Sequence, residues 1–579
     1  MAAPEQILTS LLKPAFDRLV PGADPMLRPS SREGFDFQVN GAMAAAKRLG
    51  RSPADVAADV VRAEGLGDLC SRVEVTPQGF VNLRLADDLI VACLGDVAAD
   101  ARLGAAPASA SLKVVVDYSA PNVAKEMHAG HLRTTVIGDC LCRMLVFAGH
   151  QVIRENHVGD WGTQFGMLIE HLVDVGETSG AHELSVGDLD GFYRQARAAF
   201  DASPEMQERS RRRVVALQSG DPDTLRLWRI LVDESLRYFD EVYDKLGVEL
   251  TREDVVGESF YNPMLDEVVA QLDSKGLLVD SDGAKCVFVE GWTTREGTPL
   301  PLIVRKSDGG YGYAATDLAT LWDRFGRLGA DIALYVVGAP QAQHLAMCFD
   351  VALKAGWLPS PERAVHVSFG SVLGPDRKMF KTRAGKTFKL VDLLDEAVER
   401  ARAAVSSRSA ELDVDEREDL ARAIGIGAVK YSDLSTDRAR DYVFDLDRMI
   451  SFDGNTGPYL QYARVRCLSI FRRAGLDPAD FVGVPVEVGV GEPAERALAL
   501  ALTGFSTAFA SAIETWSPHK LCAYLYDLAV VFTSFFEACP VLKAPDETTM
   551  RSRLTLCALT AAVLGQGLEL LGIDTPERM

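Results

Sequence analysis

Apolar residues in the middle of the chain alternate between strand-like and helix-like spacing. Residues 113–119 (KVVVDYS) form a short valine-rich run, which is typical of a buried parallel strand. In residues 131–150 the apolar positions cluster on one helical face, and Gly149 is placed as a C-terminal cap. Residues 151–158 (QVIRENHV) again have a strand pattern. The pattern therefore predicts a strand–helix–strand unit.

The same order of patterns returns far downstream. Residues 333–339 (ALYVVGA) and 364–374 (AVHVSFGSVLG) have strand patterns, and residues 344–356 between them have a helical one. The segment that separates the two units, at about 165–330, contains charged helical pattern. We therefore expect one parallel sheet that is interrupted by an insertion.

The two ends of the chain differ in pattern. Before a small-residue tract at 103–112, which indicates a linker, amphipathic helical spacing is mixed with a strand-like alternation at 79–85 (GFVNLRL). Beyond about residue 390, apolar residues at helical spacing dominate to the end. We expect an α+β N-terminal region and an all-α C-terminal region.

Length and composition indicate a soluble multidomain protein. With 579 residues the chain exceeds the size at which one hydrophobic core usually stops growing, so we expect three or more domains. Hydrophobic residues make up 47% and charged residues 25%, and the net charge is −21. This acidity argues against a non-specific nucleic-acid binder but allows a specific one, because phosphate contacts depend on local basic patches.

Cysteine usage and two apolar segments indicate the compartment. The ten cysteines are scattered without a CxxC pair, so we expect buried thiols in a reducing compartment and neither a zinc knuckle nor a disulfide framework. Glu5, Lys13 and Asp17 interrupt what would be the apolar core of a signal peptide. The uncharged stretch 497–513 is expected to be a buried bundle helix rather than a membrane span. These features predict a cytoplasmic protein.

The turn after the first predicted strand carries the sharpest motif, HAGH. His128 and His131 are three residues apart around Gly130, which differs from the i, i+4 spacing of a zinc-binding pair on a helix. A helix N-terminus attracts anions, and a glycine lets a phosphate approach the main chain. With Lys125, the imidazoles would suit an α-phosphate during displacement of pyrophosphate. The alternative is a pair of hydrogen-bonded structural histidines.

A basic loop follows the second strand–helix–strand unit. Its end, RAGKT, resembles part of a Walker A loop, but Phe380 stands where that motif needs glycine, and we reject this interpretation. The loop is apt for clamping a triphosphate, although it could also be a solvated basic loop. Its cations include Lys378, Lys381, Arg383, Lys386 and Lys389.

These motifs resemble those of class I aminoacyl-tRNA synthetases. HAGH resembles their HIGH signature and KMFK resembles their KMSKS loop. The resemblance narrows to arginyl-tRNA synthetases and runs essentially end to end. It is carried by the blocks SAPNVAKEMHAGHLRTTVIGD, NHVGDWGTQFG, RDYVFDLDRMISFDGNTGPYLQYARVR and GLELLGIDTPERM.

The resemblance implies a fold and an activity. The fold would be a Rossmann-type α/β class I catalytic domain at 109–390, with an α+β N-terminal domain at 1–108 that contacts the tRNA elbow and an all-α anticodon-binding domain at 391–579. The activity would be ligation of L-arginine to tRNA(Arg) with ATP and Mg²⁺, through arginyl-adenylate, by a cytoplasmic monomer without a membrane partner or a tightly bound metal.

The resemblance also implies roles for individual residues. Catalytic roles fall on Lys125, His128, His131, Lys378 and Lys381, and ATP binding on His128, Gly130, His131, His344 and Lys381. Arginine binding falls on Asp117, Asn122, Tyr313, Asp317 and Gln341, with Glu258 as a further guanidinium partner. Independently of the family, a guanidinium needs a carboxylate and planar acceptors, which Asp317 and Tyr313 could present from one helical face. Without the family, Tyr313 could equally be a core aromatic residue and Asp317 a surface charge, and Gln341 and His344 could merely begin a helix.

Binding of tRNA is expected at both ends of the chain. Between Gly454 and Arg473 there are four basic residues and no acidic one, interleaved with tyrosines, which suits phosphates and splayed bases. A solvated helix face is the alternative. The candidates are Tyr459, Tyr462, Arg464, Arg466, Arg472, Arg473 and the terminal Met579, together with Phe37, Gln38 and Asn40 in the N-terminal domain.

Two departures from the family pattern affect the assigned roles. Phe380 replaces the serine of the KMSKS loop, so that either Lys381 or Arg383 could take the place of its second lysine. We therefore rank Lys125 above the loop lysines. Asp117 stands where the family usually has glutamate.

Other classes of function share some of these features. A nucleotidyltransferase without RNA would share the HxGH chemistry but would not need the long helical C-terminal region. An RNA-binding regulator derived from a synthetase is disfavoured by the intact His128, His131 and Asp317. A specialised paralogue that supplies arginyl-tRNA to a secondary pathway remains a further alternative.

Overall fold

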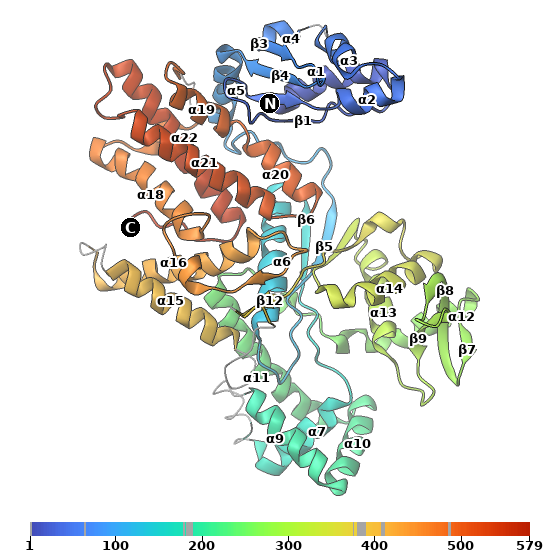
Figure 1. Cartoon of the computed structure of the whole chain (residues 1–579). Coiled ribbons are helices and arrows are strands. Elements are labelled where there is room, and N and C mark those ends of the chain that lie inside the picture. Colours follow the sequence, from blue (N-terminus) through green and yellow to red (C-terminus); the bar gives the residue numbers. More distant parts are fainter. Residues whose placement is uncertain are drawn as a thin grey trace. The chain divides into compact units, whose positions relative to one another are not determined.

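A computed structural model gives the arrangement of the helices and strands (Figure 1). The chain forms two compact units, of which unit 1 comprises Met1–Pro107, Phe452–Glu569 and Thr575–Met579, and unit 2 comprises Ala108–Ser451 and Leu570–Asp574. The structure describes residues 3–62, 65–177, 180, 189–374, 376–378, 389–406, 412–483 and 488–579.

A four-stranded parallel sheet forms the centre of unit 2. Its order is β11 (Ala364–His366), β10 (Ile332–Tyr335), β5 (Lys113–Asp117) and β6 (Gln151–Glu155). Because β10 pairs directly with β5, the prediction of one interrupted sheet is confirmed. The valines of β5 are fully buried, as a strand covered on both faces requires.

The predicted helices beside the sheet are also present. Helix α6 (Ala129–Phe147) connects β5 to β6, and Gly149 after it has a φ of 89°, as expected of a C-terminal cap. Helix α14 (Ala342–Lys354) lies between β10 and β11. The second predicted strand of this unit is divided, because β12 (Val372–Leu373) leaves the sheet and pairs with β13 (Tyr442–Val443).

The insertion contains helices and a small sheet. The helices are α7 (Gln164–Val175), α9 (Leu189–Ala202), α10 (Pro204–Gln218), α11 (Pro222–Leu246) and α12 (Leu265–Ser274), with the short turns η1 (Arg252–Asp254) and η2 (Glu258–Met264). An antiparallel sheet of β7 (Val279–Ser281), β8 (Ala284–Thr293) and β9 (Pro299–Arg305) follows, and its pattern was not recognised in the sequence. Helix α13 (Tyr313–Phe325) leads back to β10.

Unit 2 continues beyond the parallel sheet. Helices α15 (Leu390–Ser406), α16 (Val414–Leu434) and α17 (Leu446–Met449) belong to it. Arg133 of α6 and Asp433 of α16 form a fully buried ion pair at 3.3 Å, which ties these helices together. The domain boundaries at 108/109 and 390/391 stay a prediction, and the compact unit that holds the sheet extends to Ser451.

The N-terminal part of unit 1 is α+β, as predicted. Its antiparallel sheet has the order β1 (Leu27–Pro29), β2 (Phe37–Val39), β4 (Val81–Leu85) and β3 (Cys70–Val75). The predicted strand at 79–85 is β4, whose apolar residues are buried. The helices are α1 (Pro4–Leu19), α2 (Ala42–Leu49), α3 (Pro53–Val61), α4 (Leu66–Leu69) and α5 (Asp87–Ala99).

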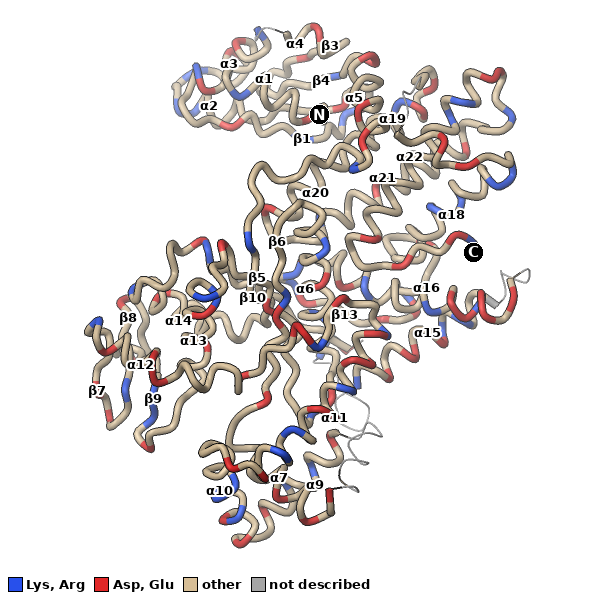
Figure 2. Tube along the Cα trace, turned by 180° about the vertical axis from the view of Figure 1, so that it is seen from behind, with Lys and Arg blue, Asp and Glu red and all other residues tan. Residues whose placement is uncertain are grey.

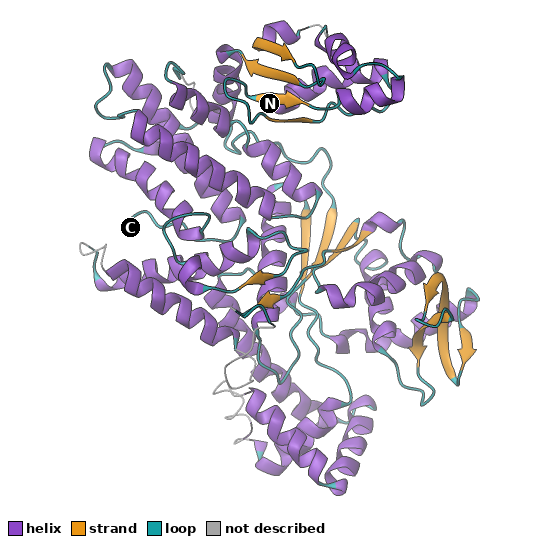
Figure 3. Cartoon of the chain, viewed as in Figure 1, coloured by secondary structure: helices purple, strands orange, loops and turns teal. Residues whose placement is uncertain are grey.

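The C-terminal part of unit 1 is helical (Figure 3). Its elements are α18 (Gly457–Ala474), η5 (Pro478–Phe481), α19 (Pro493–Leu502), α20 (Phe505–Glu514), α21 (His519–Ala538) and α22 (Glu547–Leu570), which reaches unit 2 with its last residue. The stretch predicted as one buried helix at 497–513 forms two, α19 and α20, with Gly504 between them. Within unit 1, Arg496 of α19 pairs with Asp36 at 2.7 Å and with Asp87 at 2.6 Å.

Two segments of this helical part meet a length and hydropathy criterion for membrane spans. They are Pro493–Glu514 and His519–Ala538, each with a mean hydropathy of 1.4. In each segment 39% of the most apolar window is buried within the structure, including Phe509 of α20 and Phe532 of α21, and core helices of soluble proteins can pass the same test. All ten cysteines of the chain are free and buried, as predicted from their spacing.

Candidate active site

The HAGH turn caps the N-terminus of α6. His128 is the N-cap residue, and its Nδ1 accepts a hydrogen bond from the backbone N–H of Gly130 at 3.0 Å. The backbone N–H of His128 in turn donates to Nδ1 of His131 at 3.1 Å. Because Nδ1 accepts in both rings, the proton of each neutral imidazole lies on Nε2. The histidines are thus structural caps and can still act as Nε2–H donors.

Both imidazoles are held neutral. Burial, together with the neighbouring His128, whose ring centroid is 4.1 Å away, lowers the pKa of His131 to about 3. Burial also lowers the pKa of His128. Near neutral pH these rings can donate hydrogen bonds to a phosphate but carry no charge, so the positive charge of the site has to come from lysines and the helix N-terminus.

The segment that leads into the turn has a strained backbone. Ser119, Ala120 and Ala124 have φ angles of 70°, 48° and 59°, in the left-handed region that residues with a Cβ rarely adopt. Side chains from elsewhere hold this shape, since Asn156 Oδ1 accepts from Ala120 N–H and Ser235 Oγ accepts from Ala124 N–H, each at 3.0 Å. These supports were not identified from the sequence, because they come from the residue that follows β6 and from α11.

The basic loop returns to the HAGH turn at its far end. Lys389 forms a β-bridge with His128 and an ion pair with Glu126 at 2.7 Å. Lys125 lies nearby along the chain and places Nζ 4.8 Å from the ring centroid of Tyr193 in α9. Lys378 lies in an exposed turn, where its backbone carbonyl accepts from Gly374 N–H at 2.8 Å. Lys381, Arg383 and Lys386, with Phe380, lie outside the described residues.

Three of the predicted arginine-binding residues gather around α13. Tyr313 begins this helix and is 80% exposed, and Asp317 follows one turn later. Glu258, at the start of η2, is close enough to Asp317 for the two charges to interact. Burial, together with the negative charges of Asp160 and Asp317, raises the pKa of Glu258 to about 7. A half-buried acidic pair of this kind suits a guanidinium.

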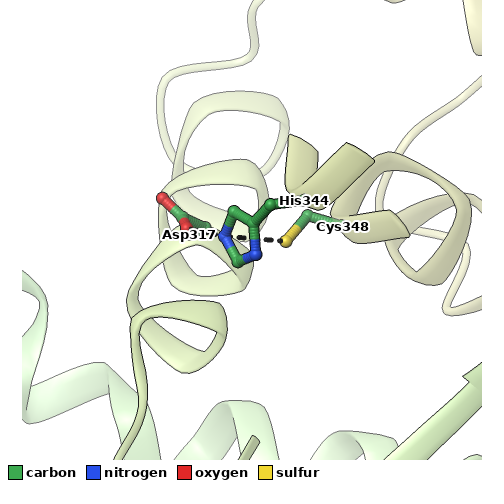
Figure 4. Close-up of side chains that lie close together, drawn as sticks. All are labelled: Asp317, His344 and Cys348. Carbon is green, nitrogen blue, oxygen red and sulfur yellow. Dashed lines mark hydrogen bonds and ion pairs between the residues drawn. The ribbon is translucent and has the colours of Figure 1, made fainter. Parts of the chain in front are cut away.

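His344 joins the same cluster. From the first turn of α14, its Nε2 contacts Oδ2 of Asp317 at 2.5 Å, which raises the pKa of His344 (Figure 4). Gln341 ends the short turn η3 (Ala339–Gln341) and occupies the N-cap position of α14, with its side chain exposed. The sequence placed His344 with ATP and Asp317 with arginine, whereas the structure brings these two side chains together.

Asn122 and Asp117 lie in different surroundings. Asn122 is exposed, and Gly159 leaves room for it, because a Cβ at Gly159 would lie 2.3 Å from Asn122 Oδ1. Asp117 ends β5 and is buried against Arg324 at 2.8 Å, which also binds Glu155 at 2.7 Å. The arginine-binding role of Asp117 stays a prediction, and its carboxylate already has a cationic partner within the protein.

Some of the α18 side chains that were predicted to contact tRNA form hydrogen bonds to the C-terminal tail. Arg464 donates to the carbonyls of Thr575 and Pro576, each at 3.4 Å, and Arg472 donates to the carbonyl of Glu577 at 2.8 Å. Arg466 instead places its guanidinium 4.3 Å from the ring centroid of Phe536. Arg464 and Arg472 thus reach the segment that ends in Met579, and Figure 2 colours the basic residues of the chain blue.

Aromatic and amide side chains complete the candidate tRNA contacts. Tyr462 is exposed, and Tyr459 is half-buried with its hydroxyl 3.3 Å from that of Thr533. In the N-terminal sheet, Gln38 donates to Asn82 at 2.8 Å. Asn40 is half-buried, whereas Phe37 belongs to the core and is only 8% exposed.

Three family models match successive parts of the chain. They are "tRNA synthetases class I (R), catalytic domain" at residues 96–446, "DALR anticodon binding domain" at 460–579 and "Arginyl tRNA synthetase N terminal domain" at 5–85. The first covers more than half of the chain and includes the HAGH turn and Asp317.

Whole-length relatives agree with these matches. An arginine–tRNA ligase of Thermobifida fusca is 54% identical over 583 residues and covers 100% of both chains. The arginine–tRNA ligase of Escherichia coli K12 is 48% identical and covers 96% of both. The crystal structure of arginyl-tRNA synthetase from Plasmodium falciparum superposes with a TM-score of 0.86 at 30% identity and 100% coverage of both chains. The chain therefore belongs to the arginyl-tRNA synthetase family of class I aminoacyl-tRNA synthetases.

Proposed function

We propose that the protein joins L-arginine to tRNA(Arg) in two steps that consume ATP. In the first, an arginine carboxylate oxygen attacks the α-phosphorus of ATP, which forms arginyl-adenylate and releases pyrophosphate. In the second, a hydroxyl of the terminal ribose of tRNA attacks the activated carbonyl, and AMP leaves. The observation that carries this proposal is the HAGH turn at the N-terminus of α6, in a chain that matches arginine–tRNA ligases along its whole length.

In the first step the protein has to stabilise charge on the transferring phosphate. Nε2–H groups of His128 and His131 would donate to it without adding charge, because burial keeps both rings neutral. The N-terminus of α6 and the close approach allowed by Gly130 would add to this. Lys125, Lys378 and Lys381 would supply the positive charge as pyrophosphate leaves.

Arginine would be recognised by charge and shape. Asp317 and Glu258 would bind the guanidinium, with the exposed ring of Tyr313 beside it. Gln341 and Asn122 would orient the polar α-carbon end toward the HAGH turn. Lysine would fill this site less well, because an ammonium lacks the planar fork that pairs with two carboxylates.

The remaining assignments follow from the family. Mg²⁺ would enter as the complex with ATP, and the protein would act as a cytoplasmic monomer without a membrane partner. The anticodon would contact α18 through Tyr459, Arg464 and Arg466, with Met579 at its edge. Gln38 and Asn40 would contact the tRNA elbow.

Charging of total tRNA tests the proposed function. With each of the twenty amino acids offered in turn, only arginine is expected to be esterified, in an ATP-dependent reaction that releases AMP. A second amino acid charged at a comparable kcat/KM, or adenylate formation without any charging, would refute the assignment.

A further inference from the structure

Three potential metal ligands meet beside the proposed arginine site (Figure 4). Asp317 of α13, His344 of α14 and Cys348 one turn later on α14 each offer one atom, and these atoms lie within 4.8 Å of one another. Among the residues that the structure describes, no other group of three such side chains lies this close. The scattered cysteines did not indicate this cluster, because its carboxylate comes from a different helix.

The geometry distinguishes a cation site from a nucleophile. Nε2 of His344 lies 2.5 Å from Oδ2 of Asp317 and 3.7 Å from Sγ of Cys348, so both contacts use the same ring nitrogen. A Cys–His–Asp triad needs the thiol and the carboxylate on opposite nitrogens of the ring. Three potential ligand atoms within 4.8 Å of one another are instead an arrangement that can hold a metal ion.

The ligand set selects the metal. One sulfur, one imidazole nitrogen and one carboxylate oxygen favour Zn²⁺ over Mg²⁺ or Ca²⁺, which prefer oxygen alone. With Zn–N and Zn–O bonds of ~2.0–2.2 Å and a Zn–S bond of ~2.3 Å, tetrahedral ligands lie roughly 3.3–3.6 Å apart. The Nε2–Sγ separation of 3.7 Å is already close to this range. Asp317 and His344 would have to part slightly, and both side chains are partly exposed, at 25% and 30%.

We propose that Asp317, His344 and Cys348 bind Zn²⁺, with water as the fourth ligand, and that bound zinc excludes arginine. Zinc would take the carboxylate that the guanidinium needs and would place a dication where a cationic substrate binds. The exclusion of arginine rests on the proposed role of Asp317, whereas the metal site itself does not. The site would therefore make arginylation sensitive to free zinc.

Cobalt binding tests the metal site without any activity measurement. Co²⁺ added to the full-length, chelator-stripped protein under reducing conditions is expected to give a sulfur-to-cobalt charge-transfer band with one equivalent bound. Cys348→Ala should abolish this band and weaken zinc binding at least about tenfold. Cys286→Ala is the matched control, since Cys286 is likewise a free, buried cysteine of unit 2, in β8, and is not one of the three ligands, so the band should be unchanged. The absence of a band, or the same band in Cys348→Ala, would overturn the proposal.

Competition experiments test whether the metal ion and arginine bind at overlapping sites. In wild-type protein, saturating arginine should displace cobalt, and zinc should raise the KM for arginine while leaving that for ATP unchanged at fixed Mg²⁺. Cys348→Ala should charge tRNA normally in chelator and tolerate at least about tenfold more zinc. If the cobalt band depends on Cys348 but arginine does not displace it, the proposal that bound metal excludes arginine is wrong. Charging of tRNA in the presence of chelator tests the proposed function separately. The displacement experiment uses the wild-type protein and stays decisive if the variant melts at a lower temperature.

Discussion

At the scale of single residues, the two histidines of the HAGH turn combine a structural and a chemical role. Each uses Nδ1 to cap α6, which leaves Nε2–H as a fixed, uncharged donor. We expect His131→Ala to reduce arginylation by about two to four orders of magnitude, the usual loss when a preorganised donor to a developing charge is removed. Initial rates at saturating ATP measure this loss.

A conservative variant controls for the capping role. In His131→Asn the amide oxygen can still accept from the backbone N–H of His128, and the amide nitrogen can still donate. This variant should retain more activity than His131→Ala, and both should melt near the wild-type temperature. Wild-type rates in the alanine variant would remove His131 from the reaction.

The raised pKa of Glu258 predicts that arginine binding depends on pH. Its pKa is raised to about 7 by burial and by nearby carboxylates, so it loses its charge as the pH falls through about 7. Because only the charged form attracts a guanidinium, the KM for arginine should rise below this pH and fall above it. Glu258→Gln should show a high KM that no longer changes over this range. A KM that is flat between about pH 6 and 8 in the wild type would contradict the assignment.

Substitutions of Asp317 and Tyr313 should change the KM for arginine more than the KM for ATP. Asp317→Asn removes a charged partner of the guanidinium, so it should raise the KM for arginine far more than the KM for ATP. Tyr313→Phe removes a single hydroxyl and should give a smaller loss of the same kind. Steady-state kinetics with each substrate varied in turn measure both effects. Equal changes for both substrates would move Asp317 out of the amino-acid site.

At the scale of elements, helix α11 of the insertion supports the loop before HAGH. The hydroxyl of Tyr243 bonds to Ser119 Oγ at 2.7 Å and to Asn156 Nδ2 at 2.9 Å, and all three side chains are buried. Tyr243→Phe leaves these two polar groups without that partner, at a cost of about 1–3 kcal/mol. We expect a lower melting temperature together with a lower kcat, because the strained loop loses a support.

Another buried tyrosine provides the control for this effect. Tyr261 is fully buried, and its hydroxyl has no hydrogen-bond partner within the described part of the chain. Tyr261→Phe should therefore leave stability and kcat unchanged or slightly improved. If both variants behave alike in thermal melting and charging assays, the bonds of Tyr243 do not support the loop.

The elements that could be predicted are those with a continuous pattern. Strands β5 and β10 are apolar runs covered on both faces, and α6 and α14 each end before a glycine. Helix α14 has one buried face, whereas α6 is buried nearly all round. Strand β8 was missed, because only part of its ten residues is buried within an insertion dominated by charged helices. Strands β12 and β13 have two residues each, too few for any periodicity.

In the candidate site, too, the local features could be predicted from the sequence and the long-range contacts could not. The HAGH turn is local, so its spacing alone indicated a phosphate site at a helix N-terminus. The contacts between Asp317 and His344 and between Arg324 and Asp117 join residues far apart in the sequence. No spacing rule encodes such contacts, and only the family resemblance indicated which distant polar residues belong to one site.

At the scale of the whole molecule, the chain passes repeatedly between its two compact units. It crosses after Pro107 and after Ser451, and the short segment Leu570–Asp574 returns to unit 2 before the last residues rejoin unit 1. In this segment Gly572 has a φ of 66°, a conformation that residues with a Cβ rarely adopt, and a Cβ there would lie 2.8 Å from Nζ of the buried Lys430. Helix α22 is therefore covalently linked to an anchor in the unit that contains the HAGH turn.

We expect tRNA to influence amino-acid activation through this connectivity. If tRNA engages α18 and the tail, the binding energy can favour one arrangement of the catalytic loops, which is a coupling between two sites. We expect arginine-dependent exchange between pyrophosphate and ATP to stay near background in RNA-free protein and to appear when tRNA(Arg) is added. Noncognate tRNA should not produce it.

Oxidised tRNA separates the effect of binding from the consumption of adenylate. Periodate treatment destroys the terminal ribose diol, so such tRNA(Arg) can bind but cannot accept arginine. If binding alone assembles the active site, oxidised tRNA(Arg) should support exchange nearly as well as intact tRNA, because the coupling depends on the contacts and not on the second reaction step. Robust exchange by RNase-treated protein without any tRNA would contradict gating by tRNA. In that case the units would act independently in the first step, and tRNA would enter only as the acceptor in the second.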